Sequence, residues 1–269
     1  ALKPGNHVVA PKVMYWSLRN WLMNFATQWG LHVEFIDMSS LDELKRSVRF
    51  GKTKLVWIET PANPLWTITD IAAAAEIAHA GGAMLAVDST TASPVLTRPL
   101  TLGADIVMHS ATKYLNGHSD VIAGALVARE DSEYWTRIKS IRAQLGGTMG
   151  SFEAWLLLRG MRTLFLRVHA ASRSAQEIAE FFSTHSLVEE VLYPGLKGFA
   201  GHDIAASQMH GGFGGMLSIR VKGGEAAAIK TAANVEIWKR ATSLGGVESL
   251  IEHRASVEGA GTPAPADLL

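Results

Sequence analysis

The chain has 269 residues, enough for one large domain or two modest ones with a substantial apolar core. Hydrophobic residues make up 48% and charged residues 19%, and the formal net charge is zero, so neither disorder nor electrostatic attraction to nucleic acid or an acidic membrane is expected. With no cysteine, the chain has no disulfides, thiolate nucleophiles or Cys-ligated metal sites, and its composition is compatible with the cytoplasmic location that we expect.

From residue 5 to residue 128, short apolar segments alternate with segments that have helical spacing. The expected strands are HVVAP (7–11), HVEFID (32–37), KLVWIE (54–59), AMLAVD (83–88), DIVMHS (105–110) and IAGALVA (122–128). The expected helices are WSLRNWLMNFATQWG (16–30), SLDELKRSVRFG (40–51) and TDIAAAAEIAHAGG (69–82). This alternation predicts an α/β fold with a mostly parallel sheet that is buried on both faces.

After Arg137 the pattern changes to long helical segments. Residues 151–161 and 163–185 have helical spacing, and MLSIRV (216–221) is the one clear strand among them. We therefore predict a large domain over residues 1–158 and a smaller α+β domain over residues 159–269. No apolar run is long enough to cross a membrane.

Polar side chains follow three of the predicted strands directly. Asn63 lies in TPANP after the third strand, Asp88 ends the fourth, and HSATK, with Ser110, Thr112 and Lys113, ends the fifth. In open α/β sheets ligands bind at the carboxyl ends of the strands, so we expect these groups to share one edge. Pyridoxal phosphate needs such a set: an amine for its aldehyde, a carboxylate for its pyridine nitrogen, and donors for its phosphate.

Each of these residues also has an ordinary structural interpretation. A single lysine is most often a solvated surface residue, and Asp88 could cap the following turn. Ser110 and Thr112 could cap a helix that starts near Tyr114, which is compatible with phosphate binding there. His109 and His118 have no third ligand at suitable spacing, so we expect no metal site.

Five motifs in order, "ETPANP", "VDSTTASP", "HSATKYLNGHSD", "RGMRTLFLR" and "SLGGVESLIEH", resemble those of the Cys/Met-metabolism (transsulfuration) family of pyridoxal-phosphate enzymes. That family includes cystathionine γ-synthase, cystathionine γ-lyase, cystathionine β-lyase and methionine γ-lyase. The resemblance runs from about Lys3 to Leu269 and implies fold type I, the aspartate-aminotransferase-like fold. It also implies a homodimer or homotetramer that acts on a small amino-acid substrate.

The resemblance assigns a role to each polar group at the strand ends. Lys113 becomes the lysine that forms a Schiff base with the cofactor, and Asp88 becomes the partner of its pyridine nitrogen. Ser110 and Thr112 become phosphate ligands. Asn63 falls near the ring hydroxyl of the cofactor and the substrate carboxylate.

Outside the strand ends, the resemblance makes Tyr15 the ring that stacks on the cofactor and an acid/base, although its aromatic neighbours also allow a core role. It makes Ser243 a residue near the substrate carboxylate. Three positions depart from the family pattern: Trp16 replaces a glycine, Thr242 is neither the usual Glu nor Tyr, and Arg254 replaces a proline.

The function that the resemblance implies is carbon–sulfur β- or γ-elimination on cystathionine, methionine or cysteine-like substrates. Two alternatives stay open: a γ-replacement synthase, of the cystathionine γ-synthase or O-acylhomoserine sulfhydrylase type, and a non-catalytic truncated remnant. The family normally has phosphate ligands before Ala1 and a carboxylate-binding arginine after Leu269, so we expect a chain truncated at both ends.

Overall fold

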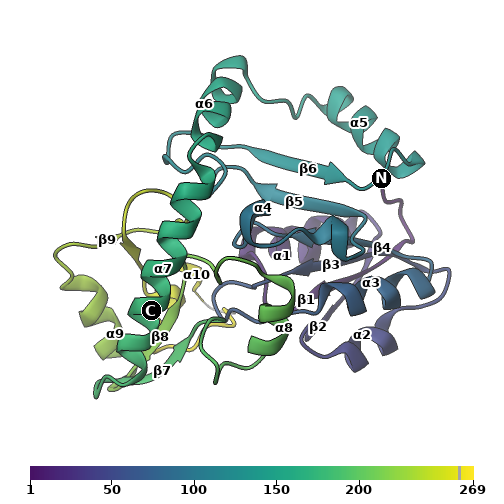
Figure 1. Ribbon diagram of the computed structural model, residues 1–269. Coiled ribbons are helices and arrows are strands. Elements are labelled where there is room, and N and C mark those ends of the chain that lie inside the picture. Colours follow the sequence, from purple (N-terminus) through teal and green to yellow (C-terminus); the bar gives the residue numbers. More distant parts are fainter. Residues whose placement is uncertain (260–261) are drawn as a thin grey trace.

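The computed structural model describes residues 1–259 and 262–269, and its main feature is a mixed β-sheet of six strands within those residues (Figure 1). The strands are β1 (His7–Pro11), β2 (His32–Ile36), β3 (Thr53–Glu59), β4 (Met84–Asp88), β5 (Ile106–Ser110) and β6 (Gly124–Ala128). Their order across the sheet is β2-β1-β3-β4-β5-β6. All neighbours pair in parallel except β5 and β6, which are antiparallel. The predicted α/β fold with a largely parallel sheet is confirmed.

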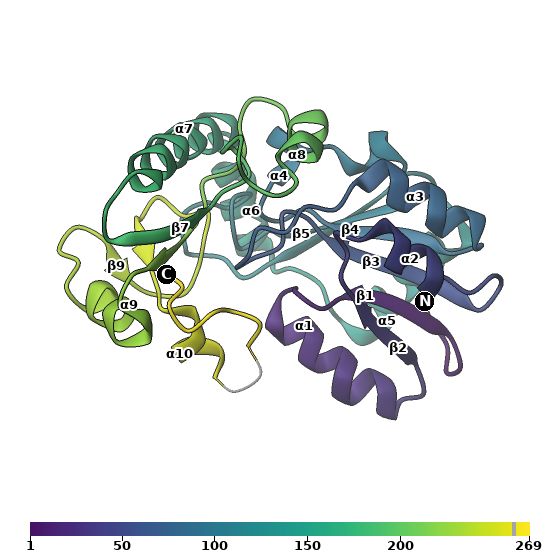
Figure 2. The same cartoon turned by 90° about the horizontal axis from the view of Figure 1, so that it is seen from below.

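The inner strands β1, β3 and β4 are mostly buried on both faces, whereas the edge strand β6 is largely exposed. Successive side chains of a strand point to opposite sides, so burial on both faces needs helices on both sides. On β1, Val9 packs in a cluster with the helices that follow β2 and β3, whereas Val8 and Ala10 pack with the helix that follows β1. Figure 2 shows these helices on opposite sides of the sheet. This explains why the strands read as continuous apolar runs.

The helices of the first part of the chain mostly follow the predicted pattern. They are α1 (Trp16–Trp21), a π-helical turn η1 (Leu22–Ala26), α2 (Leu41–Ser47), α3 (Ile71–Ala80), α4 (Ser93–Leu96) and the 3₁₀ turn η2 (Pro99–Leu102). Ser40 caps α2 by accepting a hydrogen bond from the Glu43 amide, and Asp70 caps α3 in the same way. The predicted single α-helix over residues 16–30 was wrong in detail, because its middle turn widens to π-helical geometry.

The rest of the chain packs beside the carboxyl ends of the parallel strands, except for the helix at residues 133–145, which lies near the amino terminus (Figure 1). Its elements are α5 (Glu133–Leu145), α6 (Ser151–Met161), α7 (Leu164–Ser183), β7 (Val188–Leu192), α8 (His202–Gln208), β8 (Ser218–Val221), α9 (Gly224–Ala233), β9 (Lys239–Arg240), β10 (Leu250–Ile251) and α10 (Arg254–Glu258). β7 and β8 form an antiparallel pair, and β9 and β10 a parallel one. The proposed boundary after residue 158 falls inside α6 and stays a prediction.

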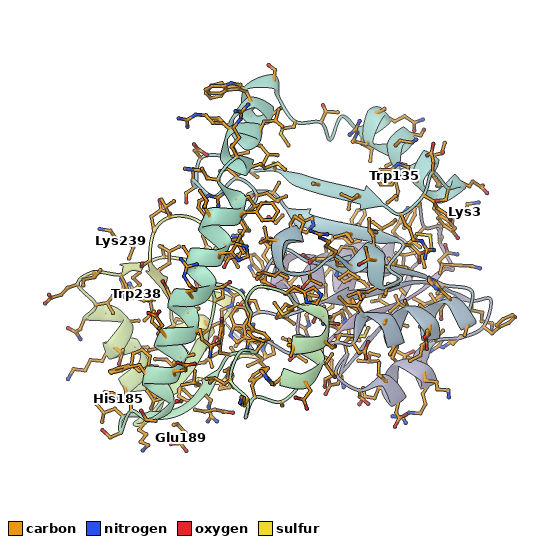
Figure 3. The ribbon with its side chains drawn as sticks, in the orientation of Figure 1. Lys3, Trp135, His185, Glu189, Trp238 and Lys239 are labelled. Carbon is orange, nitrogen blue, oxygen red and sulfur yellow. The ribbon has the colours of Figure 1, made fainter. Side chains whose placement is uncertain are left out.

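In the second half of the chain, Trp135 of α5 and Trp238, which follows α9, lie on opposite sides of the molecule in the view of Figure 3. Side chains fill the space between α7 and the sheet. A buried cluster there joins Tyr114 and Leu115, just after β5, to Leu164 and Val168 of α7. The segment after β5 therefore lies between the sheet and the long helix.

Candidate active site

Lys113 lies in a tight turn directly after β5. Its amide donates to the Ser110 carbonyl at 3.1 Å, and the Gly117 amide donates to the Lys113 carbonyl at 2.8 Å. Residues 111–116 are turn rather than helix, so Ser110 and Thr112 do not cap a helix that starts near Tyr114, which was the alternative interpretation of these residues. The chain turns away from the sheet here and leaves the Lys113 side chain at the carboxyl edge.

Three residues from distant motifs enclose this turn. A Cβ on Gly245, which has φ of +76°, would lie 2.5 Å from the Tyr114 nitrogen and 2.9 Å from the Lys113 carbonyl carbon. A Cβ on Gly160 would lie closer still to a backbone atom, the Asn116 carbonyl oxygen. Arg167 donates to the carbonyls of Tyr114 and Gly160 at 2.9 Å each. The motifs "RGMRTLFLR" and "SLGG" thus fix the position of the backbone that carries the Lys113 side chain.

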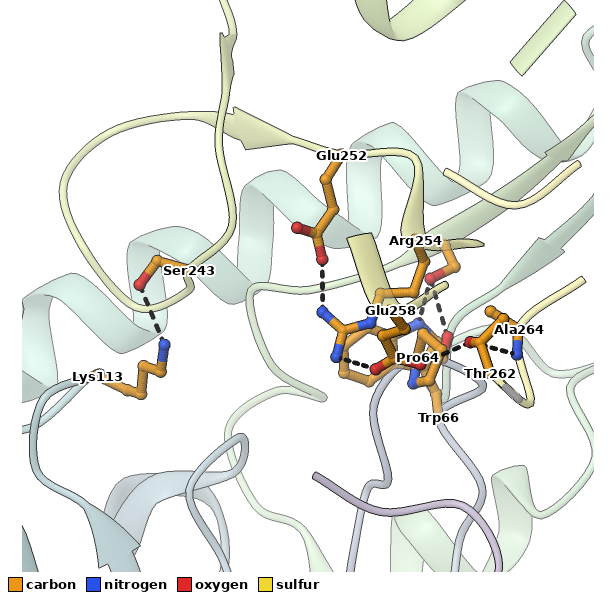
Figure 4. A network of polar contacts seen from close by, with 10 residues as sticks. Pro64, Trp66, Lys113, Ser243, Glu252, Arg254, Glu258, Thr262 and Ala264 are labelled. Carbon is orange, nitrogen blue, oxygen red and sulfur yellow. Dashed lines mark hydrogen bonds and ion pairs between the residues drawn. The ribbon is translucent and has the colours of Figure 1, made fainter. Parts of the chain in front are cut away.

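The side chain of Lys113 is half-buried, and its Nζ donates a 3.1 Å hydrogen bond to Ser243 Oγ (Figure 4). Loss of hydration lowers the pKa of the Lys113 ammonium; the negative charge of Glu252 opposes this shift, and the positive charge of Arg254 adds to it. An amine in such a setting is more readily deprotonated than a surface lysine, and only the neutral amine is a nucleophile.

Asp88 ends β4 and is almost completely buried. Its Oδ1 accepts from the amide and the hydroxyl of Thr90, at 3.0 and 2.6 Å, while Oδ2 accepts no hydrogen bond from the residues that the structure describes. Burial raises the pKa of this carboxyl, and the Thr90 hydrogen bonds oppose the rise. The Thr90 hydroxyl also accepts from the Ser110 amide at 2.8 Å, so it links Asp88 to the end of β5.

The two predicted phosphate ligands differ in their surroundings. The Thr112 hydroxyl donates to the Ala123 carbonyl at 3.2 Å and accepts from the Ala123 amide at 3.0 Å. The Ser110 hydroxyl makes no hydrogen bond within the described part of the chain. Ser110 is therefore the hydroxyl that is free to donate in this arrangement.

A cavity of about 1450 Å³ lies between the sheet edge and the C-terminal elements. Its lining includes four of the predicted site residues, Tyr15, Asn63, Lys113 and Ser243. The other three, Asp88, Ser110 and Thr112, do not belong to the lining among the described residues but lie at the strand ends beside it. Their roles stay predictions.

The three departures from the family pattern, Trp16, Thr242 and Arg254, all line this cavity. The ring of Trp16 lies 6.1 Å from that of Tyr15, at an interplanar angle of 58°. Arg254 is buried and pairs with Glu252 and Glu258, at 2.6 Å each (Figure 4). Arg254 thus begins α10 as a buried cation that is neutralised by two carboxylates.

Glu59, the last residue of β3, belongs to the site but is not among the residues that the sequence predicts for it. It is 6% exposed, lies opposite Asp88 in the strand register, and binds two backbone amides near the cavity. Its position at a strand end is the sequence signal for a site residue, the same signal that Asp88 gives. The partners of Arg254 lie two positions before and four positions after it in the sequence, but the burial of this network is a property of the tertiary structure.

The other polar groups of the described residues do not form a metal site. Among residues 1–259 and 262–269, no three His, Asp or Glu side chains are placed to hold a metal ion. His109 is buried, and burial lowers its pKa, while His118 bonds to the Asn116 carbonyl. No described helix combines the length and the apolar character that a bilayer crossing requires.

The donor set fits pyridoxal phosphate on its chemistry. It offers a partly desolvated amine, a buried carboxylate with one oxygen not engaged by the described residues, and an unengaged hydroxyl near the same strand end. Lys113 would hold the aldehyde carbon, Asp88 the pyridine nitrogen, and Ser110 part of the phosphate.

Comparison with known proteins gives a consistent result. The family model of the Cys/Met metabolism PLP-dependent enzymes matches residues 1–266. The chain is 43% identical over 273 residues to a cystathionine γ-synthase of Mycobacterium tuberculosis, covering 100% of this chain and 70% of the relative. It is 42% identical over 263 residues to a cystathionine γ-lyase of Dictyostelium discoideum, covering 98% and 67%. The crystal structure of metB from Corynebacterium glutamicum superposes with a TM-score of 0.95 at 42% identity, covering 99% of this chain and 70% of that one.

Proposed function

Because the chain belongs to the Cys/Met metabolism family of PLP-dependent enzymes, we propose that it cleaves or exchanges a carbon–sulfur or carbon–oxygen bond of an amino acid, with the cofactor attached at Lys113. The observation that carries the proposal is the position of Lys113 Nζ, half-buried in the cavity and bonded to Ser243 Oγ at 3.1 Å. The substrate is a small amino acid with a sulfur or acyl-oxygen substituent at Cβ or Cγ.

Pyridoxal phosphate, when bound, supplies an electron-withdrawing ring that makes the Cα proton of an attached amino acid acidic. Lys113 Nζ takes this proton, since its lowered pKa leaves more of the amine neutral than in a surface lysine. The Ser243 hydroxyl orients Nζ, and the Asp88 carboxylate keeps the proton on the ring nitrogen. Tyr15 and Asn63 line the same cavity; Tyr15 would pack on the ring, and Asn63 would bind the ring hydroxyl or the substrate carboxylate.

Elimination and γ-replacement remain the two candidate reactions. The cystathionine γ-lyase among the relatives supports elimination, and the cystathionine γ-synthase supports replacement. Thr242 lines the cavity and carries no charge, so it gives neither reaction an acid or a base at that position. Product analysis with cystathionine, and with an O-acylhomoserine with and without added cysteine, separates the two. An oxo acid and ammonia indicate elimination, whereas a thioether formed only with cysteine indicates replacement.

The attachment residue is tested by borohydride reduction of the protein with pyridoxal phosphate, followed by peptide mass spectrometry. We expect the reduced adduct on Lys113 and none in Lys113→Ala, which should also lose turnover. Lys12→Ala is a suitable control, because Lys12 is an exposed lysine that does not line the cavity. An adduct on another lysine, or turnover retained by Lys113→Ala, would refute the assignment. A protein that binds no cofactor under saturating conditions would support the non-catalytic alternative.

We also propose that the protein assembles as a homodimer or homotetramer, and its location in the cytoplasm stays a prediction. Trp155 and Leu158 of α6 and Phe165 and Leu166 of α7 are all more than half exposed, and such a group of large apolar side chains favours a protein partner. Trp155→Glu should lower the mass measured by sedimentation. Phe50→Glu, at an exposed loop position, is the control and should leave the mass unchanged.

A further inference from the structure

Glu59 is a buried carboxyl group that the proposed reaction does not use. It ends β3 directly beside Asp88 of β4, and neighbouring parallel strands lie only about 4.8 Å apart. Both residues are at most 6% exposed. Two carboxyl groups are seldom buried side by side without a function or strong partners, because each disfavours the charge of the other.

The partners of Glu59 are two backbone amides from separate parts of the chain. Oε2 accepts a 2.7 Å hydrogen bond from the Tyr15 amide, and Oε1 accepts a 3.2 Å hydrogen bond from the Asn63 amide. Tyr15 is the residue before α1, where no side chain caps the helix, and Asn63 lies in the loop after β3. One carboxylate therefore joins two segments whose bonded amides, at Tyr15 and Asn63, are 48 residues apart in sequence.

Both of these segments carry a side chain into the cavity that Lys113 lines. Tyr15 and Asn63 are lining residues, and both are candidate cofactor contacts. A shift of either backbone would move its side chain relative to the cofactor, and misplacement on the scale of 1 Å costs an active site much of its efficiency.

We propose that Glu59 is a positioning residue that sets the Tyr15 ring and the Asn63 amide for the cofactor by binding the backbone amides of both. This inference rests on the proposed function for the identity of the bound group. It concerns residues of this chain only, since the two hydrogen bonds exist without a ligand.

The charges around Glu59 make this tie sensitive to pH. Burial and the charge of Asp88 on β4 raise the pKa of Glu59 to about 8, while the two amides and Arg254 on α10 oppose the rise. The ionised form accepts at both oxygens with full charge, and the protonated form binds the amides more weakly. A cationic ring nitrogen held beside Asp88 favours ionised Glu59, so cofactor binding should tighten both hydrogen bonds.

The test compares Glu59→Gln with a matched control, Glu34→Gln, whose carboxylate also ties several segments, through Ser47, Arg49 and His7, but does not line the cavity. A glutamine has one carbonyl oxygen, so at least one of the two amides loses its acceptor. In the cofactor-free protein, hydrogen exchange at the Tyr15 or Asn63 amide should become about tenfold faster, the effect of one lost buried hydrogen bond. The dissociation constant for pyridoxal phosphate should rise by a similar factor, and the circular dichroism of the bound cofactor should weaken. Glu34→Gln should change none of these quantities.

Unchanged exchange at both amides would overturn the proposal. Faster exchange with unchanged cofactor affinity and dichroism would also overturn it, since Glu59 would then be only structural.

If Glu59→Gln does not fold, the wild-type protein gives the answer by NMR. The chemical shifts of the Tyr15 and Asn63 amides should titrate with one shared midpoint, and that midpoint should fall when cofactor is added. Separate or absent titrations would refute the tie. A borohydride adduct on a lysine other than Lys113 would refute the proposed function instead, and the exchange result in the cofactor-free protein would stand.

Discussion

Replacing Arg254 with alanine should cost the protein a large part of its stability. The Arg254 side chain is 7% exposed, and its two partners, Glu252 and Glu258, are 22% and 6% exposed. Without the guanidinium, the buried Glu258 carboxylate keeps only the Thr262 hydroxyl as a hydrogen-bond donor within the described residues. A buried ion left without its partner destabilises a protein by about 3–5 kcal/mol.

The expected loss is measured as the change in the free energy of unfolding from urea denaturation, at equal slope of the transition. The control is Lys139→Ala, which removes an exposed pair with Asp131 whose side chains are 48% and 73% exposed. Such a surface pair is worth about 1 kcal/mol or less. The double variant Arg254→Ala with Glu258→Gln should recover part of the loss, because the amide leaves no buried charge.

An Arg254→Ala variant that loses no more stability than Lys139→Ala would refute this reasoning, since the burial of the pair would then have no energetic effect. A double variant that is less stable than Arg254→Ala would refute the explanation by unpaired charge. The same network continues from Glu258 through Thr262 to the Ala264 amide, while Asp267 and Leu269 are held separately by contacts with β8. The loss should therefore include loosening of residues 262–264. Increased proteolysis in that segment would report it directly.

Two further predictions concern Lys113 and its turn. Gly245→Ala should destabilise the protein by about 1–3 kcal/mol more than Gly51→Ala, because both have positive φ but only Gly245 lies against the Lys113 and Tyr114 backbone; equal losses in thermal unfolding would contradict this. Lys113→Met should stabilise the cofactor-free protein at neutral pH, since burial lowers the folded-state pKa below the ordinary value of 10.5. The folded chain releases the Lys113 proton at a lower pH than the unfolded chain, so the stabilisation gained by Lys113→Met should shrink as pH rises towards 10.5. A stabilisation that does not change with pH in urea denaturation would disprove the desolvation argument.

Much of the sheet and the position of its ligand edge follow from local patterns. Continuous apolar runs such as KLVWIE predict buried parallel strands, and the residues directly after them predict where polar side chains gather. The sequence narrows the caps to Ser39 or Ser40 for α2 and to Thr69 or Asp70 for α3, because a cap needs only the first turn of its own helix; the structure has Ser40 and Asp70. These inferences depend on neighbours within a few positions, which the sequence displays directly.

The contacts that shape the site depend on distant segments, and only the tertiary structure decided them. Gly245, Gly160 and Arg167 pack against the backbone of the turn at Lys113, and none of them lies within 40 residues of it. Glu59 likewise gains its role when β3, β4 and the segment before α1 come together, and the Arg254 network, whose members are close in sequence, becomes important because the fold buries it. Burial, and the presence or absence of a partner in the interior, set the energy of such groups, and neither property can be calculated from the residue types alone.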